Sequence, residues 1–344
     1  MYFMRENRLR NMAVSMNVVK TLSQINEYKG KQVIYKKQPK DVLEILSKDA
    51  ILNFSTTRSN NVSLCTDKEE LDKIINNEKI PKTREEIDIV ECRDLVNTVN
   101  SAYENILINS QTILELHGYL YKYSLTRGGR YRIKNAGIEQ DINNLEYKNF
   151  IEFDLNEVSK CVETLCLEYN NIIEKDEIDI LITIAIFILD FILIQPFKEG
   201  NIKMAKILLL LLLNKNGYKV GKYISLSTLN DECYCDYINV DKSLESYDSY
   251  DITKWLEYFL DTILIAYQEL DNRLLIVDNK KKTKRDRIEK IINSTLGYFT
   301  KDDIKALCPD IAEATINRVF NNLRKEDKIE VIAKGRSARW KKKY

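Results

Sequence analysis

The twelve residues Gln195-Pro196-Phe197-Lys198-Glu199-Gly200-Asn201-Ile202-Lys203-Met204-Ala205-Lys206 lead directly into an apolar segment, Ile207–Leu213. A glycine and an asparagine just before a helix leave backbone N–H groups and the positive end of the helix dipole around a small cavity, where phosphates bind. An acid beside such a cavity supplies an oxygen ligand for a divalent metal that bridges phosphates. Two lysines three residues apart share one helix face. The stretch therefore predicts a nucleotide-phosphate site, with Glu199 as metal ligand and with Gly200, Asn201, Lys203 and Lys206 around the phosphates.

Charge is distributed unevenly along the chain. The 344 residues allow two or three domains, and the net charge of +1 gives the whole molecule no preference for polyanions. Residues 278–344, however, contain 19 Lys and Arg against 10 Asp and Glu, a net charge of +9 that leaves −8 for the rest. This asymmetry predicts a basic C-terminal module with a nucleic-acid or acidic partner.

Composition also predicts a cytoplasmic protein with reduced thiols and no membrane partner. The seven cysteines form no recognisable disulfide framework, and Cys233 and Cys235 lack partners for a tetrahedral zinc site. Charged residues at positions 5, 6, 8 and 10 interrupt any signal peptide. The apolar run Ile180–Leu189 is shorter than the roughly 20 residues that span a bilayer. We therefore expect it, like Ile207–Leu213, to be a helix buried on all sides.

The pattern along the chain predicts an all-α protein, because ten glycines and four prolines leave room for long helices with short loops. A glycine-rich point, Arg127–Arg132, is followed by residues 138–153, which have no helical pattern and are expected to form an extended loop or a short hairpin. Helices are expected at about 43–54, 69–77, 85–107, 111–121, 155–173, 178–193, 228–241 and 251–277.

The segment 195–206 resembles the signature of the Fic family, whose members typically transfer AMP from ATP to protein hydroxyls. That signature reads His-x-Phe-x-[Asp/Glu]-Gly-Asn-[Gly/Lys]-Arg-x-x-Arg. The family histidine is the general base that takes the proton from the attacking hydroxyl, and Gln195 occupies its position. Phe197, Glu199, Gly200 and Asn201 match the signature, whereas Gln195, Ile202, Lys203 and Lys206 depart from it.

These departures from the signature predict slower catalysis and weaker phosphate binding. A glutamine has no usable pKa near neutrality, and general base catalysis contributes about 10²–10⁴-fold. Gln195 could instead orient a hydroxyl or a phosphate, or be a plain polar loop residue. Ile202 would crowd the phosphates, and the two lysines keep positive charge without the bidentate fork of arginine. The alternatives are an ordinary exposed acid at Glu199, a helix cap at Asn201 and surface lysines without a role.

The resemblance extends over about residues 40–275. His117 lies where the family often has a histidine ahead of a Gly-x-x-Arg element, matched by Gly129-Arg130-Tyr131-Arg132, and Phe197 is expected to anchor the loop in the core. Asp251–Trp255 resembles the element that opens the last family helix. By resemblance, residues 138–153 are the flap that holds a target protein by strand addition. Tyr234 lies where the family places a tyrosine near adenine, with a core tyrosine as the alternative.

Many Fic proteins also carry an inhibitory helix with a Ser/Thr-x-x-x-Glu-[Gly/Asn] motif, whose glutamate pairs with the second signature arginine. The corresponding stretch is Ser55–Asn60, in which Ser55 and Asn60 match and Ser59 replaces the glutamate. The resemblance thus implies that both members of the inhibitory ion pair are absent, Ser59 on one side and Lys206 on the other.

The C-terminal module resembles the winged-helix domain that many Fic proteins append. We expect helices at Arg285–Ile292, Lys301–Leu307 capped by Thr300, and Glu313–Lys325, then a hairpin of Lys328–Ala333 and Ala338–Lys342. Core positions of the third helix are expected at Ala314, Val319, Phe320 and Leu323. Such a helix enters the major groove of double-stranded DNA; the alternative is dimerisation, as in a homodimer, or target docking. The DNA contacts would come from Thr315, Asn317, Arg318, Arg324, Lys334, Arg336 and Arg339.

The sequence thus predicts an N-terminal helical region (1–80), a Fic domain (81–277), a basic linker (278–284) and a winged-helix module (285–344). The favoured function is an ATP- and Mg²⁺-binding protein of the Fic type whose AMP transfer is lost or strongly reduced, with DNA binding by the module. One rival is a working transferase in which the substrate or another residue supplies the base. The other is a partner-binding scaffold that takes no nucleotide.

Overall fold

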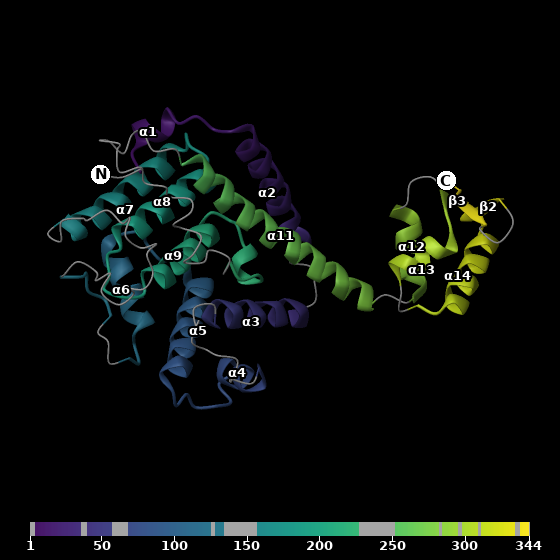
Figure 1. Cartoon of the computed structure of the whole chain (residues 1–344), viewed down its shortest axis with the longest axis horizontal. Helices are drawn as coiled ribbons and strands as arrows, with labels where there is room; N and C mark the ends of the chain where they lie inside the picture. The colour runs from purple at the N-terminus through teal and green to yellow at the C-terminus, as the bar shows by residue number, and fades with distance from the viewer. Residues whose placement is uncertain are drawn as a thin grey trace, which may run out of the picture. The chain divides into compact units, whose positions relative to one another are not determined.

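The computed structural model of the chain describes residues 4–35, 40–56, 68–124, 128–133, 157–226, 252–281, 284–294, 298–308, 311–333 and 338–343. The chain forms two compact units, Met1–Leu270 and Asp271–Tyr344 (Figure 1). The boundary between them falls within one long helix, α11 (Thr253–Lys281).

The described part of the first unit is helical, which confirms the all-α class expected from the sequence. The capping box at Thr83 shows how local sequence starts a helix: its hydroxyl accepts from the Glu86 N–H, and the Glu86 carboxylate accepts from the Thr83 N–H. In chain order the helices are α1 (Glu6–Arg10), α2 (Met16–Tyr35), α3 (Lys40–Thr56), α4 (Lys68–Ile75), α5 (Arg84–Ala102), α6 (Ser110–Leu120), α7 (Val158–Lys175), α8 (Ile180–Ile194) and α9 (Asn201–Lys215), followed by a 3₁₀ turn (Val220–Lys222) and α11.

The core of the first unit is built around α8 and α9, which lie next to each other in Figure 1. Every residue of α8 from Leu181 onward is buried, and so is α9 from Met204 to Asn214, which confirms that these apolar runs are internal helices. The helix α9 also packs against α5. Trp255 fixes α11 to α8, because its buried indole donates to the Ala185 carbonyl oxygen at 2.9 Å.

After the end of α11, the described part of the second unit contains three helices and a small antiparallel sheet around its own core. The helices are α12 (Lys284–Ser294), α13 (Lys301–Leu307) and α14 (Glu313–Lys325), close to the expected bounds. Strands β2 (Ile329–Ala333) and β3 (Arg339–Lys342) form the expected hairpin, and β1 (Tyr298–Phe299) adds a third strand beside β3. The expected core position Ala314 is wrong: it is exposed, and Ile316 is buried instead because it shares a helix face with Val319 and Phe320.

None of the described helices combines the length and the apolar character needed to cross a bilayer. The described cysteines, Cys92, Cys161, Cys166 and Cys308, are buried and form no disulfide. Several expected features lie outside the described residues: the flap at 138–153, the helix at 228–241, Asp251, and the side chains of Ser59, Asn60, Tyr234, Lys334 and Arg336.

Candidate functional site

The loop between α8 and α9 begins with Gln195, which ends α8 in the left-handed conformation at φ 44° and ψ 63°. Its backbone is held at both ends, because its N–H donates to the Phe191 carbonyl at 3.2 Å and its carbonyl accepts from Arg132 Nε at 2.8 Å. A non-glycine residue in this region costs on the order of 1 kcal/mol and persists only where its surroundings hold it. The backbone of Gln195 is therefore fixed by its contacts with Phe191 and Arg132.

Arg132 is the residue that closes the C-terminal end of α8. It is buried, its N–H donates to the Pro196 carbonyl at 2.9 Å, and its guanidinium reaches the carbonyls of Ile194 and Gln195. Burial lowers the pKa of its guanidinium. A helix end leaves carbonyl groups without intrahelical partners, and a buried arginine satisfies them here. Arg132 is thus a structural clamp on the loop.

Phe197 and Asn201 close the loop on itself. The Phe197 N–H donates to Asn201 Oδ1 at 2.9 Å, and Asn201 Nδ2 donates to the Phe197 carbonyl at 2.8 Å. Phe197 is fully buried, as expected for a loop anchor. Asn201 is the first residue of α9 and not its cap, since Gly200 occupies the N-cap position. The side-chain amide of Asn201 therefore stabilises the loop, and one of its two Nδ2 hydrogens is used in the bond to Phe197.

His117 lies against the loop from α6. Its ring stacks on Phe197 with centroids 3.6 Å apart and planes 2° apart. The Gly129 N–H donates to Nδ1 at 2.9 Å, so the ring proton is on Nε2, which lies 3.1 Å from the Glu199 carbonyl oxygen. Burial lowers the pKa of His117 to about 4. The imidazole is thus neutral, with both ring nitrogens used to hold the loop.

The N-terminal end of α9 offers backbone N–H groups to a ligand. Those of Gly200, Asn201 and Ile202 have no acceptor among the described residues. Gly200 has φ 78°, and a Cβ built on it would lie 2.6 Å from the hydroxyl oxygen of Tyr121, so only glycine fits. Glu199 is exposed beside these groups. These are the backbone groups that the sequence predicted to surround the phosphates.

Lys203 and Lys206 are less available to bind a phosphate than the sequence implied. Lys203 Nζ lies 3.3 Å from Asp88 Oδ2 of α5, and Asp88 also pairs with Arg84 at 2.7 Å. Lys206 is buried, with 8% of its surface exposed. An anion that approaches Lys203 must compete with the Asp88 carboxylate, which weakens the electrostatic contribution of this lysine.

Glu91 is a second acid of α5 beside these charges. It is 1% exposed; Oε1 accepts from the Tyr123 N–H at 2.6 Å, and Oε2 lies 3.6 Å from Arg84. Burial raises the pKa of its carboxyl group. Arg84, Asp88 and Glu91 follow one another at helical spacing, so they lie on one face of α5. The acids on this face, Asp88 and Glu91, offset the positive charge of Lys203.

The remaining predicted residue of this region is Ser55, at the end of α3, a helix that packs against α5. Its buried hydroxyl has no hydrogen-bond partner in the described part of the chain. Ser55 thus lies on the helix that supports α5.

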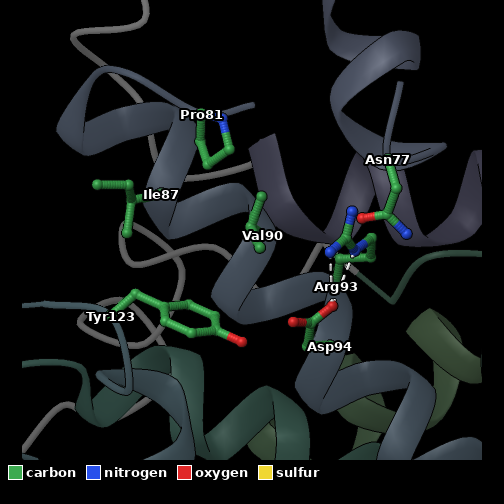
Figure 2. A pocket seen from close by; sticks show the side chains of 7 residues that line it. All are labelled: Asn77, Pro81, Ile87, Val90, Arg93, Asp94 and Tyr123. Atoms are coloured by element: carbon green, nitrogen blue, oxygen red, sulfur yellow. Dashed lines mark hydrogen bonds and ion pairs between the residues drawn. The ribbon is translucent and has the colours of Figure 1, made fainter. Parts of the chain in front are cut away.

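A pocket of about 490 Å³ lies on a different face of α5 and does not include the loop (Figure 2). Figure 2 shows Arg93 and Asp94 joined at one end of it. The Arg93 guanidinium is bound to Asp94 and to the Ile74 carbonyl at 2.7 Å, so it holds α4 and α5 together. The pocket is lined by Asn77, Pro81, Ile87, Val90, Arg93, Asp94 and Tyr123.

Sequence reasoning missed Arg84, Asp88 and Glu91 as members of the site. Their spacing along α5 was visible, but nothing in the sequence says that this face of α5 meets the first turn of α9. His117 and Arg132 were noticed as family elements, and the structure adds what they do: they hold the loop. Among the described residues no three carboxylate, thiol or imidazole groups gather to hold a metal.

Comparison with known proteins agrees with this geometry. Residues 107–213 match the model of the Fic/DOC family. The chain is similar to a Fic family protein from Desulfovibrio desulfuricans, with a TM-score of 0.54 and 16% identity over 96% of this chain and 97% of that one. It is similar to a Fic domain containing signaling protein from Bacteroides thetaiotaomicron, with a TM-score of 0.56 and 13% identity over 75% and 97% of the two chains.

A third similar structure is Fic-1 from C. elegans, with a TM-score of 0.54 and 17% identity over 74% of this chain and 72% of that one. No curated protein matches the chain. At these identities the structural likeness concerns the fold, and the family model covers the segment from α6 to α9 that builds the loop. The chain therefore contains a Fic/DOC family domain at residues 107–213, within a helical core that has the fold of Fic family proteins.

Proposed function

We propose that the chain is a nucleotide-binding protein of the Fic type in which AMP transfer from ATP to protein hydroxyls is lost or strongly reduced. The observation that carries this proposal is the identity of the residue at the position of the family base. Gln195 stands where the family base would be, and an amide does not take up a proton near neutral pH.

The chain's single histidine does not substitute for the missing base. His117 is neutral, but its Nδ1 lone pair accepts the Gly129 N–H and its Nε2 proton faces the Glu199 carbonyl. Taking up a proton at Nδ1 would require loss of the Gly129 hydrogen bond in a buried site, at a cost of about 1–3 kcal/mol. The imidazole therefore supports the loop and does not act in proton transfer.

Nucleotide binding is supported by the backbone of the loop. The N–H groups of Gly200, Asn201 and Ile202 would bind phosphate oxygens at the positive end of α9, and Glu199 would ligate Mg²⁺. Bound Mg²⁺ would neutralise phosphate charge. The pairing of Lys203 with Asp88 opposes anion binding, so we expect a weaker affinity than the intact signature would give.

Two measurements test the proposal. The full-length protein is incubated with α-labelled ATP and Mg²⁺ in the presence and absence of lysate proteins, and ATP binding is measured by calorimetry. We expect binding without label transfer. Robust transfer by the natural chain would instead establish the working transferase, and absence of heat at millimolar ATP would establish the scaffold that takes no nucleotide.

A matched pair of variants tests the role of position 195. Histidine and asparagine both tolerate the left-handed backbone, so Gln195→His and Gln195→Asn should fold equally well. Only Gln195→His restores a base, and we expect it to raise label transfer by at least about 100-fold over Gln195→Asn. Equal transfer by the two variants, with ATP still bound, would show that more than the base is missing.

A further inference from the structure

We propose that the pocket beside α5 binds a free α-amino acid with a large apolar side chain, such as L-phenylalanine. This pocket, here called the α5 pocket, is lined by Asn77, Pro81, Ile87, Val90, Arg93, Asp94 and Tyr123. Its volume of about 490 Å³ lies within the range of small-molecule sites, roughly 300–1,000 Å³. The proposal is independent of the nucleotide site, because none of the lining residues belongs to the signature loop or to α9.

The α5 pocket has an apolar side and a polar side. Figure 2 shows the apolar side formed by Pro81, Ile87 and the Tyr123 ring, and the polar side formed by Asn77, Arg93 and Asp94. Ile87, Val90 and Asp94 recur at helical spacing, so one stripe of α5 contributes to both sides. Ligand sites typically combine an apolar lining with a few placed polar groups. The α5 pocket therefore suits a ligand with an apolar body and a polar head.

Asp94 offers a free carboxylate oxygen to the head of such a ligand. Arg93 donates to Asp94 Oδ1 from Nε at 2.9 Å and from Nη2 at 2.7 Å, and Oδ2 has no partner among the described residues. In Figure 2 the Tyr123 hydroxyl is directed toward Asp94, and this hydroxyl also has no hydrogen-bond partner in the described part of the chain. An ammonium group can donate to both oxygens. This end of the polar side is therefore the place for the amino group of the ligand.

The other end of the polar side offers hydrogen-bond donors. Arg93 has five N–H donors, and its bonds to Asp94 Oδ1 and to the carbonyls of Ile74 and Ile75 use four of them, which leaves one on Nη2. The side-chain amide of Asn77 has no acceptor within the described ranges. These donors suit a carboxylate group.

The charges of the lining favour a zwitterion over a simple ion. Arg93 and Asp94 carry opposite charges and the other lining residues carry none, so the lining has no net charge. An α-amino acid also has no net charge, and it presents a positive group to Asp94 and a negative group to Arg93. A simple amine or a simple acid would desolvate one of these two side chains without a partner for it. An aromatic side chain would add an offset stack on the Tyr123 ring.

The test is isothermal titration calorimetry of the full-length protein with L-phenylalanine at millimolar concentration, for which we expect saturable binding of one molecule per chain. Three analogues each lack one part of the ligand: 2-phenylethylamine lacks the carboxylate, 3-phenylpropanoate lacks the ammonium group and glycine lacks the apolar side chain. We expect each analogue to bind at least about fivefold more weakly, since a charged hydrogen bond or a buried aromatic side chain contributes that much or more.

Two variants test the location of the site. Asp94→Asn keeps an acceptor for Arg93 and removes the negative charge, so it should lower the affinity for L-phenylalanine by about five- to tenfold. Tyr123→Phe keeps the ring and the backbone N–H that donates to Glu91, and loss of its hydroxyl should lower the affinity by about two- to fivefold. Asp302→Asn is the matched control, because Asp302 is an exposed acid of α13 in the other unit.

Thermal unfolding without ligand shows whether each variant is folded, and if Asp94→Asn is not, Tyr123→Phe and the analogues still decide. Absence of saturable binding overturns the proposal. An affinity that neither pocket variant lowers, or that the control lowers equally, places the ligand elsewhere and overturns it as well. Equal affinity for any one of the three analogues overturns the assignment to an apolar α-amino acid.

Discussion

His117 shows how a single residue can look catalytic and be structural. It is the only histidine of the chain, it lies beside the loop, and its ring is neutral. Yet each ring nitrogen has a backbone partner, and one face of the ring covers Phe197. Gln195 is the opposite case, since its backbone is tightly held and its amide side chain has no acid–base chemistry near neutral pH.

The neutral state of His117 predicts a loss of stability at mildly acidic pH. Its pKa in the folded protein is about 4 and its unfolded value is about 6.5, so the unfolded state binds more protons between these values. Stability is fully present above pH 6.5 and falls as the pH is lowered toward 4, by roughly 3 kcal/mol in total. Urea unfolding at pH 7, 6 and 5 measures this slope.

His117→Phe is the control for this prediction, because it keeps a ring over Phe197 and removes the titrating group. The variant should be less stable at pH 7 by about 1–3 kcal/mol, since the Gly129 N–H loses its acceptor. Its stability should also change less between pH 7 and 5 than that of the natural chain. Glu91 works in the opposite direction, since its raised pKa favours the folded state at low pH, but it is common to both proteins. Identical slopes would rule out His117 as the source.

At the scale of elements, the junction between the loop and α9 depends on Gly200. Gly200→Ala would force a side chain onto φ 78° and into the Tyr121 hydroxyl at 2.6 Å. We expect the free energy of unfolding to fall by about 1–3 kcal/mol. Gly118→Ala in α6 is the control, because its Cβ would meet nothing closer than 3.9 Å; it should be neutral or stabilise by up to about 1 kcal/mol. Comparable melting temperatures for the two variants would contradict this view of the junction.

The contact between α5 and α9 predicts how removal of a charged side chain changes the affinity for ATP. Asp88→Asn should release Lys203 for a phosphate and raise the affinity for ATP by about two- to fivefold, the equivalent of a partly exposed ion pair. Lys203→Gln should lower it. Calorimetric titration with ATP and Mg²⁺ distinguishes the two variants. An unchanged or weaker affinity of Asp88→Asn would mean that Lys203 does not face the ligand.

At the scale of the whole molecule, each of the two units has a hydrophobic core among its described residues. The core of the second unit includes Phe299, Phe320 and Trp340, with Phe320 and Trp340 in an edge-to-face contact at 5.1 Å. We therefore expect residues 278–344 to fold alone, with helical circular dichroism and a cooperative thermal transition. In this fragment Phe320→Ala should abolish the transition, because loss of about 3–5 kcal/mol exceeds what so small a core supplies. A fragment without cooperative melting would contradict the prediction.

Much of the fold could be predicted because its determinants are local. The helical periods of α5 to α9, the cap at Thr300 and the apolar runs of α8 and α9 depend on residues within a few positions of one another. The error at Ala314 could have been avoided from spacing alone, because Ile316 recurs at helical spacing with Val319, Phe320 and Leu323, whereas Ala314 lies on the opposite side of α14. The resemblance to the Fic signature likewise implied that Phe197 anchors the loop, and Phe197 is fully buried.

The sequence by itself determined that the chain is a set of helices around two apolar ones, and that the residue after the first of them, Gln195, carries an amide. Only the tertiary structure decided which groups satisfy one another. Lys203 meets Asp88 across 115 residues, and Arg132 meets the Gln195 carbonyl across 63. The physical reason is that an ion pair or a buried hydrogen bond depends on the approach of two elements within about 4 Å, and residue spacing along one helix contains no information on the helix that packs against it.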